Sequence, residues 1–405
     1  MRILVSNVGS TSLKFKLFAM PQEVVLCTAK VERVGSETAI YQYTNEVTGW
    51  KRREEGIPVR SYADGIARFF EDVTDREHGA AKDVSQICGV GFKTVVAKGY
   101  DGVCELTDRV MNAMRDYLFI APAHNGPYLM AIGEFNRILP GVPKVGVFET
   151  AYHATIPLKY RMYGIPYEWM EKYGIMRKGY HGASFTYIAE QACADGAWRN
   201  IIGCHLGGSC SVCAIQDGKS FDDSFGFSLQ TGLLHANRCG DTDPYLFPFL
   251  MNEGLEQEEI IAGLSKRGGL LGISGVSNDL REIEAAADAG NRRAQLAIEV
   301  FVAGVIRYIG SFYAELGGLD KLVFTGGIGE NSARIREKIC GALPHLGIKL
   351  DRKKNQSLRG EGYISAEDSP VRVHVIPANE ELGVARQTYR RILSGKDLSL
   401  EAELC

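Results

Sequence analysis

The sequence predicts an α/β protein built from two similar units. Strand-like and helix-like segments alternate along the chain, which is typical of this fold class. An apolar strand at residues 2–8 runs into a Gly-Ser turn and a second strand, and the same pattern returns from residue 201, close to half the chain later. Residues 87–96 and 320–331 form a further pair, because each is an apolar strand that enters glycines. We therefore interpret the chain as an internal duplication of one α/β unit, with the active site between the halves. The alternative, which the period alone leaves open, is that such hairpins recur by chance in an α/β protein.

Length and composition agree with two closely joined domains. The chain has 405 residues, of which 45% are hydrophobic and 23% charged, a mixture that permits a large core. The net charge is −3, from 46 basic and 49 acidic residues. This balance argues against nucleic acid or an anionic membrane as the main partner, whereas a small anionic ligand needs only a few local cations.

The chain shows no export signal and no obvious membrane span. Its first apolar run is too short for a signal peptide, and we find no stretch of about 18 uninterrupted apolar residues. Several of the 10 cysteines, including Cys88, Cys204 and Cys213, lie in apolar strand-like runs, as buried reduced thiols do. Cys210 and Cys213 form a C-x2-C pair, but no partner pair follows at zinc spacing. We expect a cytoplasmic protein.

Local patterns predict several further elements. Helical spacing predicts helices over 109–120 and 284–317, and the polar stretch 351–370 is expected to be a loop. The pair Asp217–Gly218 predicts a hairpin turn. Lys219 and Ser220 follow this turn, but the earlier glycine of a phosphate-binding P-loop is missing.

The first Gly-Ser turn is a candidate phosphate site. Its polar residues are Asn7, Ser10, Thr11, Ser12 and Lys14. A glycine lets the backbone approach an anion, hydroxyls and amides donate hydrogen bonds to it, and a lysine supplies charge. The turn at residues 207–209 resembles the first, and two facing hairpins would clamp a polyphosphate. A Gly-Ser hairpin also occurs as an ordinary turn, so this pattern alone leaves both readings open.

Two glycine-containing runs, residues 272–281 and 324–331, are candidates for a nucleoside pocket. The second is an apolar strand that opens into glycines before a predicted helix, which suits a base or ribose packed on the backbone. A tight strand-to-helix crossover is the alternative explanation.

Polar clusters elsewhere fit phosphoryl transfer to a carboxylate. This reaction needs magnesium, cations and alignment, and its acceptor is already an anion, so that no general base is required. No Ser-His-Asp or paired-carboxylate signature is present. The clusters are residues 121–125, 147–153, 179–182, 237–241 and 377–381.

Together these segments resemble the acetate kinase family of the sugar kinase, Hsp70 and actin superfamily. The agreement is ordered and spans nearly the whole chain. The matching segments are NVGSTSLKF, APAHN, GVPKVGVFETAYH, KYGIMRKGYHGAS, HLGGSCSV, NRCGDTDP, GLLGISGVSNDLRE, VFTGGIGENS and IPANEELGVAR.

The resemblance implies two duplicated α/β domains of the ribonuclease H-like type with a nucleotide cleft between them. Residues 1–149, completed by 384–405, would form the N-terminal domain, and residues 150–383 the nucleotide-binding and dimerisation domain. The implied protein is a homodimeric kinase that transfers a phosphoryl group reversibly between ATP and a short-chain carboxylate. It would use Mg²⁺ or Mn²⁺ and produce an acyl phosphate and ADP.

The resemblance also implies roles for individual residues. Implied catalytic residues are Glu149, His181, Arg238 and His124. Implied carboxylate-binding residues are Lys93, Val95 and Arg238. Implied nucleotide and phosphate ligands are Ser10, Ser12, Lys14, His205, Gly207, Gly208, Asp279, Arg281, Gly327 and Asn331. Implied metal-site residues are Asn7 and Glu380, with the adjacent Glu381 as an alternative.

Some positions differ from the residues usual in the family. Lys93 stands where an arginine is usual, and a lysine cannot provide the bidentate fork of a guanidinium. The other exchanges are Glu149 for aspartate, Gly208 for asparagine, Ala123 for leucine, Leu229 for proline and His235 for methionine. We expect Ala123 to enlarge the acyl pocket and His235 to offer a donor to a polar substituent. A different carboxylate, pyrophosphate as phosphoryl donor, and a non-catalytic nucleotide-binding homologue are the alternatives.

Overall fold

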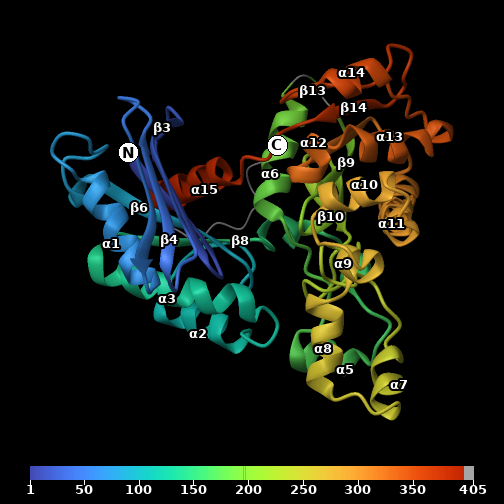
Figure 1. Ribbon diagram of the computed structural model, residues 1–405, viewed down its shortest axis with the longest axis horizontal. Coiled ribbons are helices and arrows are strands. Elements are labelled where there is room, and N and C mark those ends of the chain that lie inside the picture. Colours follow the sequence, from blue (N-terminus) through green and yellow to red (C-terminus); the bar gives the residue numbers. More distant parts are fainter. Residues whose placement is uncertain (195, 197, 396–405) are drawn as a thin grey trace. The chain divides into compact units, whose positions relative to one another are not determined.

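The computed structural model describes residues 1–194, 196 and 198–395, and the chain divides into two compact units (Figure 1). Unit 1 contains Met1–Ala154 and the segment that begins at Asn379, and unit 2 contains Thr155–Ala378. The last ten residues of the segment expected to complete the N-terminal domain, 396–405, lie outside the described residues.

Unit 1 is built on an eight-stranded sheet with the order β5-β4-β3-β2-β1-β6-β8-β7. Strands β1 to β5 form an antiparallel meander, β6 runs parallel to β1, β8 runs parallel to β6, and β7 closes the edge antiparallel to β8. The strands are β1 (Arg2–Gly9), β2 (Ser12–Ala19), β3 (Val24–Glu32), β4 (Ser36–Asn45), β5 (Lys51–Val59), β6 (Ile87–Thr94), β7 (Val103–Glu105) and β8 (Lys144–Phe148).

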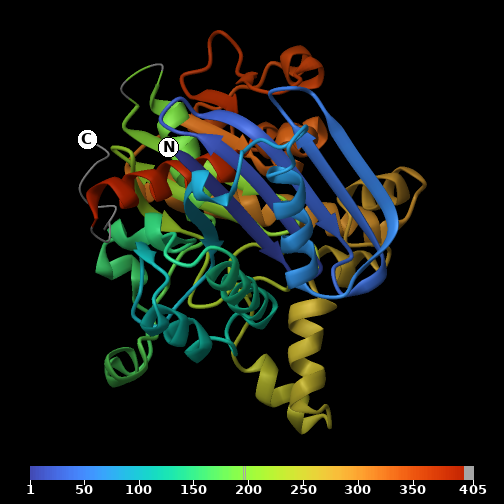
Figure 2. The same cartoon turned by 90° about the vertical axis from the view of Figure 1, so that its left-hand side faces the viewer.

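Helices cover both faces of this sheet (Figure 2). They are α1 (Tyr62–Val73), α2 (Asp108–Asp116), α3 (Pro122–Ile138) and α15 (Glu380–Ser394). On the face covered by α1 and α3, Phe15 stacks on Phe69 with ring centroids 4.4 Å apart. On the opposite face α15 packs on β1, β6 and β8. Gly89 and Gly91 permit this close approach, because a Cβ atom at either position would collide with the side chain of Ile392 or Thr388.

Unit 2 repeats the same plan on a six-stranded sheet with the order β11-β10-β9-β12-β14-β13. Strands β9, β10 and β11 form a meander, and β12 and β14 continue parallel to β9, as β6 and β8 continue from β1. The predicted duplication is therefore confirmed. The strands are β9 (Asn200–Leu206), β10 (Cys210–Gln216), β11 (Lys219–Asp223), β12 (Lys321–Thr325), β13 (Gly362–Tyr363) and β14 (Arg372–Val375).

The helices of unit 2 lie around this sheet and in an excursion beyond β11 (Figure 1). They are α4 (Leu158–Arg161), α5 (Tyr167–Tyr173), α6 (Gly182–Cys193), α7 (Leu246–Asn252), α8 (Gln257–Lys266), α9 (Gly269–Ser274), α10 (Leu280–Asp288), α11 (Arg292–Leu316), α12 (Gly326–Asn331), α13 (Ala333–Gly341) and α14 (Arg352–Ser357). Short 3-10 helices occur at Val84–Gln86, Ala151–Thr155 and Pro344–Leu346.

Helix α11 forms much of the core of unit 2. Phe301, Val305, Ile309 and Phe312 on one side of it are almost completely buried against the sheet and the neighbouring helices. By length and composition alone, α11 is also the one helix among the described residues that is apolar enough to cross a membrane. Its apolar side is accounted for by this core.

The predicted helix at 284–317 is two helices. Gly290 adopts a φ of +90°, which a helix cannot continue, and Asn291 then caps α11 by accepting a hydrogen bond from the backbone N–H of Ala294 at 3.1 Å. The residues after Asn291 restart the helical spacing in nearly the same phase, and the periodicity alone did not reveal the break.

Two other predicted elements are also corrected. The helix expected over 109–120 ends at Asp116. The stretch 351–370 is not only loop, because Asp351 caps the short helix α14 by accepting from the backbone N–H groups of Lys353 and Lys354. The hairpin at Asp217–Gly218 is confirmed, with positive φ at both residues.

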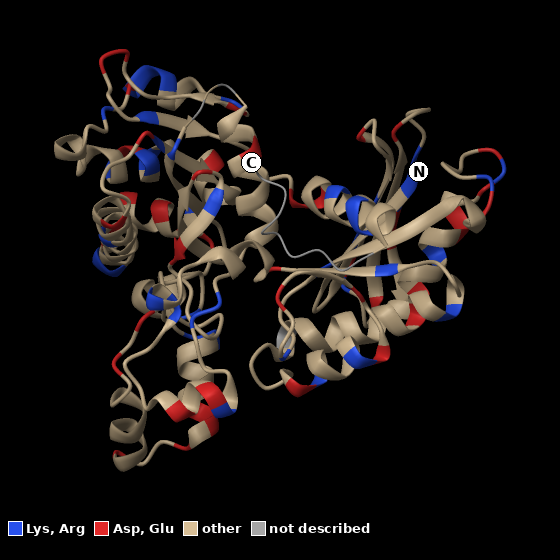
Figure 3. Cartoon of the chain, turned by 180° about the vertical axis from the view of Figure 1, so that it is seen from behind, with Lys and Arg blue, Asp and Glu red and all other residues tan. Residues whose placement is uncertain are grey.

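The cysteine predictions hold in part. Cys204, Cys210 and Cys213 are buried free thiols, and burial raises the pKa of Cys210 to about 12. Cys88 is exposed near the beginning of β6, so its predicted burial is wrong. Basic and acidic residues are interspersed over both units in the view of Figure 3, as expected from the balanced composition.

Candidate functional site

The first Gly-Ser turn joins β1 to β2, and Tyr62, the first residue of α1, hydrogen-bonds to its backbone. The hydroxyl of Tyr62 lies 2.8 Å from the carbonyl oxygens of both Gly9 and Ser10. A Cβ atom at residue 9 would lie 2.6 Å from Oγ of Ser12, so a larger residue there would displace the Ser12 hydroxyl. Ser10 is exposed and Ser12 is half-buried, so the tip of this hairpin carries two hydroxyl groups that a ligand could reach.

Asn7 lies just before this turn, paired across the strands with Lys14. The hydroxyl of Tyr128 donates to Oδ1 of Asn7 at 3.3 Å and accepts from the backbone N–H of Val8 at 3.2 Å. Tyr128 comes from α3 and is almost completely buried, which raises its pKa. No sequence motif singled out this tyrosine, which orients the side chain of the predicted metal-site residue.

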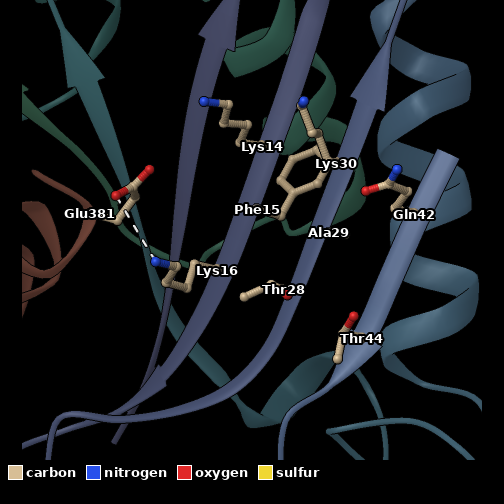
Figure 4. A pocket seen from close by; sticks show the side chains of 9 residues that line it. All are labelled: Lys14, Phe15, Lys16, Thr28, Ala29, Lys30, Gln42, Thr44 and Glu381. Atoms are coloured by element: carbon tan, nitrogen blue, oxygen red, sulfur yellow. Dashed lines mark ion pairs between the residues drawn. The ribbon is translucent and has the colours of Figure 1, made fainter. Parts of the chain in front are cut away.

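Lys14 lines a hollow of about 240 Å³ on the open face of β2, β3 and β4 (Figure 4). Lys14 stands directly opposite Lys30 in the strand register. Lys30 is paired with Glu32 at 2.6 Å, and Lys16 lies 4.0 Å from Glu381. Lys14 forms no ion pair with the residues that the structure describes, so its ammonium group is available to an anion.

Lys93, Glu149 and Glu380 form a largely buried charged cluster in unit 1. Nζ of Lys93 lies 2.6 Å from Oε2 of Glu380 and 3.6 Å from Oε1 of Glu149. Burial opposes the charged form of Lys93, but the two carboxylates outweigh it and raise the pKa of the lysine above its ordinary value. Lys93 therefore stays protonated between two carboxylates, with a net charge of −1 for the three groups when both glutamates are ionised.

The two candidate metal-site glutamates face different partners. Glu380 is the first residue of α15, beside Lys93, whereas Glu381 lies near Lys16. Negative charge in the first turn of a helix is favoured by the helix dipole. The geometry thus separates Glu380, which belongs to the charged cluster, from Glu381, which belongs to the lysine-lined hollow.

Val95 and His124 lie near the junction of β6 and α3. Val95 is buried just beyond β6, and His124 is exposed in the first turn of α3. The side chain of Asn125 ties these segments together by donating to the carbonyl oxygen of Val96 at 2.9 Å. The side chain of residue 123, predicted to enlarge the acyl pocket, lies outside the described structure.

In unit 2, His181 and His205 stack with ring centroids 4.1 Å apart and an interplanar angle of 25°. Nδ1 of His181 lies 2.8 Å from Oγ of Ser211, and Nδ1 of His205 lies 2.8 Å from Oγ of Ser184. His181 adopts a left-handed backbone conformation with φ of 59° as it caps α6. A non-glycine residue rarely takes this conformation, and such local strain is often found at functional sites.

The side chain of Arg238 is held next to the second glycine turn. One terminal nitrogen donates to the carbonyl oxygen of Leu229 and the other to Oγ of Ser209, both at 2.5 Å. Burial lowers the pKa of Arg238 to about 10, so the guanidinium remains charged at neutral pH. The group of Leu229 that accepts this hydrogen bond is its main-chain carbonyl oxygen, which leucine and the expected proline both carry.

The donor that we expected His235 to offer to a polar substituent, its Nε2–H, is not exposed in the described structure. It is completely buried, and its Nδ1 accepts a hydrogen bond from the backbone N–H of Cys210 at 2.9 Å. Its own backbone N–H donates to the carbonyl oxygen of Arg238 at 3.0 Å. The ring stacks on Phe225, which meets His181 edge-on at 5.4 Å. His235 therefore contacts Cys210 after the second glycine turn, the backbone of Arg238, and Phe225, which in turn contacts His181.

A pocket of about 580 Å³ in unit 2 brings both predicted nucleoside runs together with the second glycine turn. Its lining residues include Gly207, Gly208, Asn278, Asp279, Arg281, Glu284, Gly327, Ile328, Asn331 and Ser332. Six of the ten residues predicted as nucleotide and phosphate ligands line this one pocket, namely Gly207, Gly208, Asp279, Arg281, Gly327 and Asn331. His205 does not line it, and the remaining three, Ser10, Ser12 and Lys14, belong to unit 1. Its volume falls within the range usual for ligand pockets.

The glycines of this pocket leave the backbone accessible. Gly326 has a φ of +77°, and a Cβ atom there would lie 2.7 Å from the carbonyl oxygen of Leu206. At Gly208 and Gly327 an added Cβ would meet nothing within 4 Å. Gly326–Asn331, predicted to be a glycine turn, is the short helix α12, and the side chain of Asn331 donates to the carbonyl oxygen of Gly327 at 2.9 Å.

Asp279 and Arg281 form an exposed pair at the pocket. Asp279 caps α10 and accepts from the backbone N–H of Arg281 at 2.9 Å, while the two side chains meet at 2.5 Å. The contact with Arg281 lowers the pKa of Asp279 to about 2.

Several residues of these sites were not predicted from the sequence. Tyr128, Ser184 and Ser211 orient predicted residues, and Glu284 lines the pocket. Ser184 and Ser211 lie within the matching segments KYGIMRKGYHGAS and HLGGSCSV, so the motif was visible but the contact was not. For Tyr128 and Glu284, which lie outside the motifs that were singled out, only spatial proximity reveals a role.

Comparison with known proteins gives a consistent result. The model of the Acetokinase family matches residues 2–386. The acetate kinases of Alkaliphilus metalliredigens and Methanosarcina thermophila are each 42% identical to this chain and cover 96% of it, with 99% and 96% of their own lengths.

Solved structures agree with the sequence relatives. The crystal structure of Porphyromonas gingivalis acetate kinase is similar with a TM-score of 0.86 and 36% identity over 97% of this chain and 99% of that one. A propionate kinase from Francisella tularensis has a TM-score of 0.88 and 34% identity, over 96% and 99% of the two chains. The predicted fold class and the predicted resemblance are confirmed, and the chain belongs to the Acetokinase family.

Proposed function

We propose that this protein is an ATP-dependent carboxylate kinase that transfers a phosphoryl group reversibly between ATP and acetate or a related short-chain acid. The products in the forward direction are an acyl phosphate and ADP. Family membership over the whole chain supports this reaction class, and the relatives named above are acetate and propionate kinases.

The observation that carries the proposal is the fixed guanidinium of Arg238 beside the Gly207-Gly208 turn. Phosphoryl transfer depends mainly on charge stabilisation and alignment of the transferring group. A charged arginine whose position is set by two hydrogen bonds needs little reorganisation to meet the developing negative charge. The nearby histidine pair, His181 and His205, adds further potential hydrogen-bond donors to phosphate oxygens.

On the acceptor side we assign Lys93 to the carboxylate and Glu149 to the support of Lys93. An ammonium group attracts a carboxylate as a point charge, without the planar fork of arginine. Its position is nevertheless restricted, because Glu149 and Glu380 hold the ammonium at 3.6 and 2.6 Å. Val95 and His124 are assigned to the same acceptor region, and Ser10, Ser12 and Lys14 to phosphate oxygens.

The donor groups of unit 1 fit a magnesium ion. Carboxylate and amide oxygens are the ligands this ion prefers, and Glu380 and Asn7 supply one of each. Asn7 accepts a hydrogen bond from Tyr128, and Glu380 is paired with Lys93. When bound, magnesium would neutralise phosphate charge. Asn7 and Glu380 would hold it, and Lys93 would limit the negative charge that remains around it.

We further propose a cytoplasmic homodimer that associates through unit 2. Tyr167, Trp169 and Tyr173 on α5, and Phe249 and Met251 on α7, are exposed large apolar residues of unit 2. Exposed clusters of this kind commonly mark protein interfaces. The expected result is a dimer in analytical ultracentrifugation that Trp169→Glu together with Phe249→Glu converts to a monomer. A monomeric wild-type protein would contradict the proposal.

The reaction is tested by trapping acyl phosphate as hydroxamate with ATP, magnesium and a panel of acetate, propionate, butyrate and hydroxylated acids. We expect activity with at least one acid and a lower kcat/KM for acetate than for a longer acid, because Ala123 in place of leucine is expected to enlarge the acyl pocket and Lys93 orients a carboxylate less strictly than arginine. If acetate is preferred by about tenfold or more, the assignment of a larger acyl pocket is wrong. Activity with pyrophosphate but not ATP, or nucleotide binding without any transfer, would identify one of the two alternatives.

A further inference from the structure

The nucleoside pocket of unit 2 is lined by two kinds of polar group, the backbone of glycines and the carboxylates of acidic side chains. Gly207, Gly208 and Gly327 present backbone to it, whereas Asp279 and Glu284 present carboxylates from α10. A triphosphate or pyrophosphate carries only acceptors and several negative charges, so it is attracted by backbone N–H groups and repelled by carboxylates. A nucleoside is neutral and carries N–H and O–H donors. The carboxylate-lined part of the pocket therefore suits a nucleoside and disfavours a bare polyphosphate.

The two carboxylates are not equivalent. Asp279 is neutralised by Arg281, whose guanidinium lies 2.5 Å away. Glu284 forms no ion pair with the described residues, and its only hydrogen bond among them comes from Ser332, whose Oγ donates to Oε1 at 3.1 Å. The other oxygen, Oε2, has no donor in the part of the chain that the structure describes. Glu284 thus keeps its full charge and one acceptor oxygen.

Ser332 fixes the orientation of Glu284. As the N-cap of α13, Oγ of Ser332 accepts a hydrogen bond from the backbone N–H of Ile335 at 3.2 Å. The hydroxyl hydrogen of Ser332 is then donated to Oε1 of Glu284. The carboxylate is held by a hydroxyl that is itself held by a helix terminus, and Glu284 is only half-buried, so it remains accessible from the pocket. A fixed acceptor of this kind discriminates between ligands more sharply than a mobile one.

We propose that Glu284 is a specificity residue that selects a nucleoside and rejects a bare polyphosphate. Its carboxylate accepts a hydrogen bond from a donor of the nucleoside, either a ribose hydroxyl or a base N–H. The same charge raises the free energy of a pyrophosphate placed in the pocket. The inference rests on the proposed function, because it assumes that the pocket holds the nucleotide co-substrate. It assigns to Glu284 the choice between ATP and pyrophosphate as phosphoryl donor.

The test is calorimetric binding of ADP, ATP and pyrophosphate to the full-length wild-type protein and to three variants. Glu284→Gln removes the charge at constant size, and Glu284→Asp keeps the charge but shortens the reach. Glu282→Gln is the matched control, since Glu282 lies exposed on the same helix and does not line the pocket. We expect Glu284→Gln to weaken ADP binding about tenfold and to strengthen pyrophosphate binding. Glu284→Asp should weaken ADP binding but still exclude pyrophosphate, and the control should match wild type.

Analogues identify which donor is recognised. If the donor is a ribose hydroxyl, 2′-deoxyADP or 3′-deoxyADP binds the wild-type protein as weakly as ADP binds Glu284→Gln. If the donor is the adenine amino group, the deoxy analogues behave like ADP and purine riboside diphosphate shows the loss.

The proposal is overturned if Glu284→Gln, shown to be folded by circular dichroism, binds ADP and pyrophosphate as the wild type does. That result leaves the proposed kinase function intact, because the nucleotide still binds. Failure of the wild-type protein to bind either nucleotide would instead overturn both the inference and the proposed use of ATP.

Discussion

The predicted site residues of unit 1 and unit 2 stand on the same strand framework but are held by different forces. In unit 1 Lys93, Glu149 and Glu380 hold one another by charge, with distances of 2.6 and 3.6 Å between the ammonium and the two carboxylates. In unit 2 His181 and His205 are held by serine hydroxyls and by ring stacking, and Arg238 by a hydroxyl and a carbonyl. The Lys93 cluster of unit 1 therefore depends on charge balance, whereas the contacts that hold His181, His205 and Arg238 in unit 2 are made with uncharged groups.

The positions that we expected to differ from the family occur in both kinds of cluster. The exchanges at Lys93 and Glu149 lie in the same charged cluster, and together they keep one positive and one negative group in contact. In unit 2 the exchange at Leu229 preserves a main-chain contact, and the exchange at Gly208 leaves open space. A cluster held by charge tolerates changes that keep the charges, while a cluster held by hydrogen bonds tolerates changes that keep the backbone.

The largest expected effect comes from Arg238 in unit 2. Arg238→Ala should lower kcat by a factor of about 100 or more, because it removes a fixed donor to the transferring group. The fold should be retained, since Arg238 is half-buried and its partners are one hydroxyl and one carbonyl. The measurement is kcat for the best carboxylate beside a thermal unfolding curve. Turnover near that of the wild type would remove Arg238 from the mechanism.

The second prediction concerns charge balance in unit 1. Lys93→Met should destabilise the protein by about 3 kcal/mol, because two largely buried carboxylates lose their shared counter-ion. Lys30→Met is the control on the same sheet, since the exposed Lys30–Glu32 pair should contribute less than about 1 kcal/mol. Urea unfolding measures both. If the two variants lose the same stability, the cluster is not held by charge.

The third prediction tests the neutral contacts of unit 2. His235→Leu leaves the buried N–H of Cys210 without an acceptor and should cost about 2 kcal/mol in stability and about tenfold in kcat. His235→Asn restores an acceptor at a similar position and should recover most of the activity. Equal activity of both variants would show that the ring itself, and not the hydrogen bond to Cys210, positions the turn.

The smallest expected effect is a pH dependence of stability that arises from Asp222 in unit 2. Burial outweighs the nearby cation for this acid, whereas the buried glutamates of unit 1 share Lys93 as a counter-ion. Burial raises the pKa of Asp222 in unit 2 to about 7, although Arg177 lies 3.5 Å away. The folded protein then binds more protons than the unfolded chain between about pH 4 and 7, so stability falls as pH rises through this range. We expect a fall of a few degrees in Tm between pH 5 and 8 that is smaller in Asp222→Asn. An identical pH profile of the variant would contradict this assignment.

The sequence alone was sufficient for the duplicated α/β framework, because strand period, glycine turns and their repetition are local patterns. It also pointed to two short runs, 272–281 and 324–331, that supply part of the lining of the pocket in unit 2, whereas Glu284 was not predicted. It did not reveal that Asn291 begins a new helix, because the apolar spacing continues across the break.

Only the tertiary structure decided how the site residues are held. Lys93 meets Glu380 from the other end of the chain, and Tyr128 reaches Asn7 from α3. His235, expected to face a substrate, is buried as a brace instead. Ser332 fixes Glu284 from a different helix. Such contacts join residues far apart in sequence, and a hydrogen bond depends on angstrom-scale distances that no local pattern encodes.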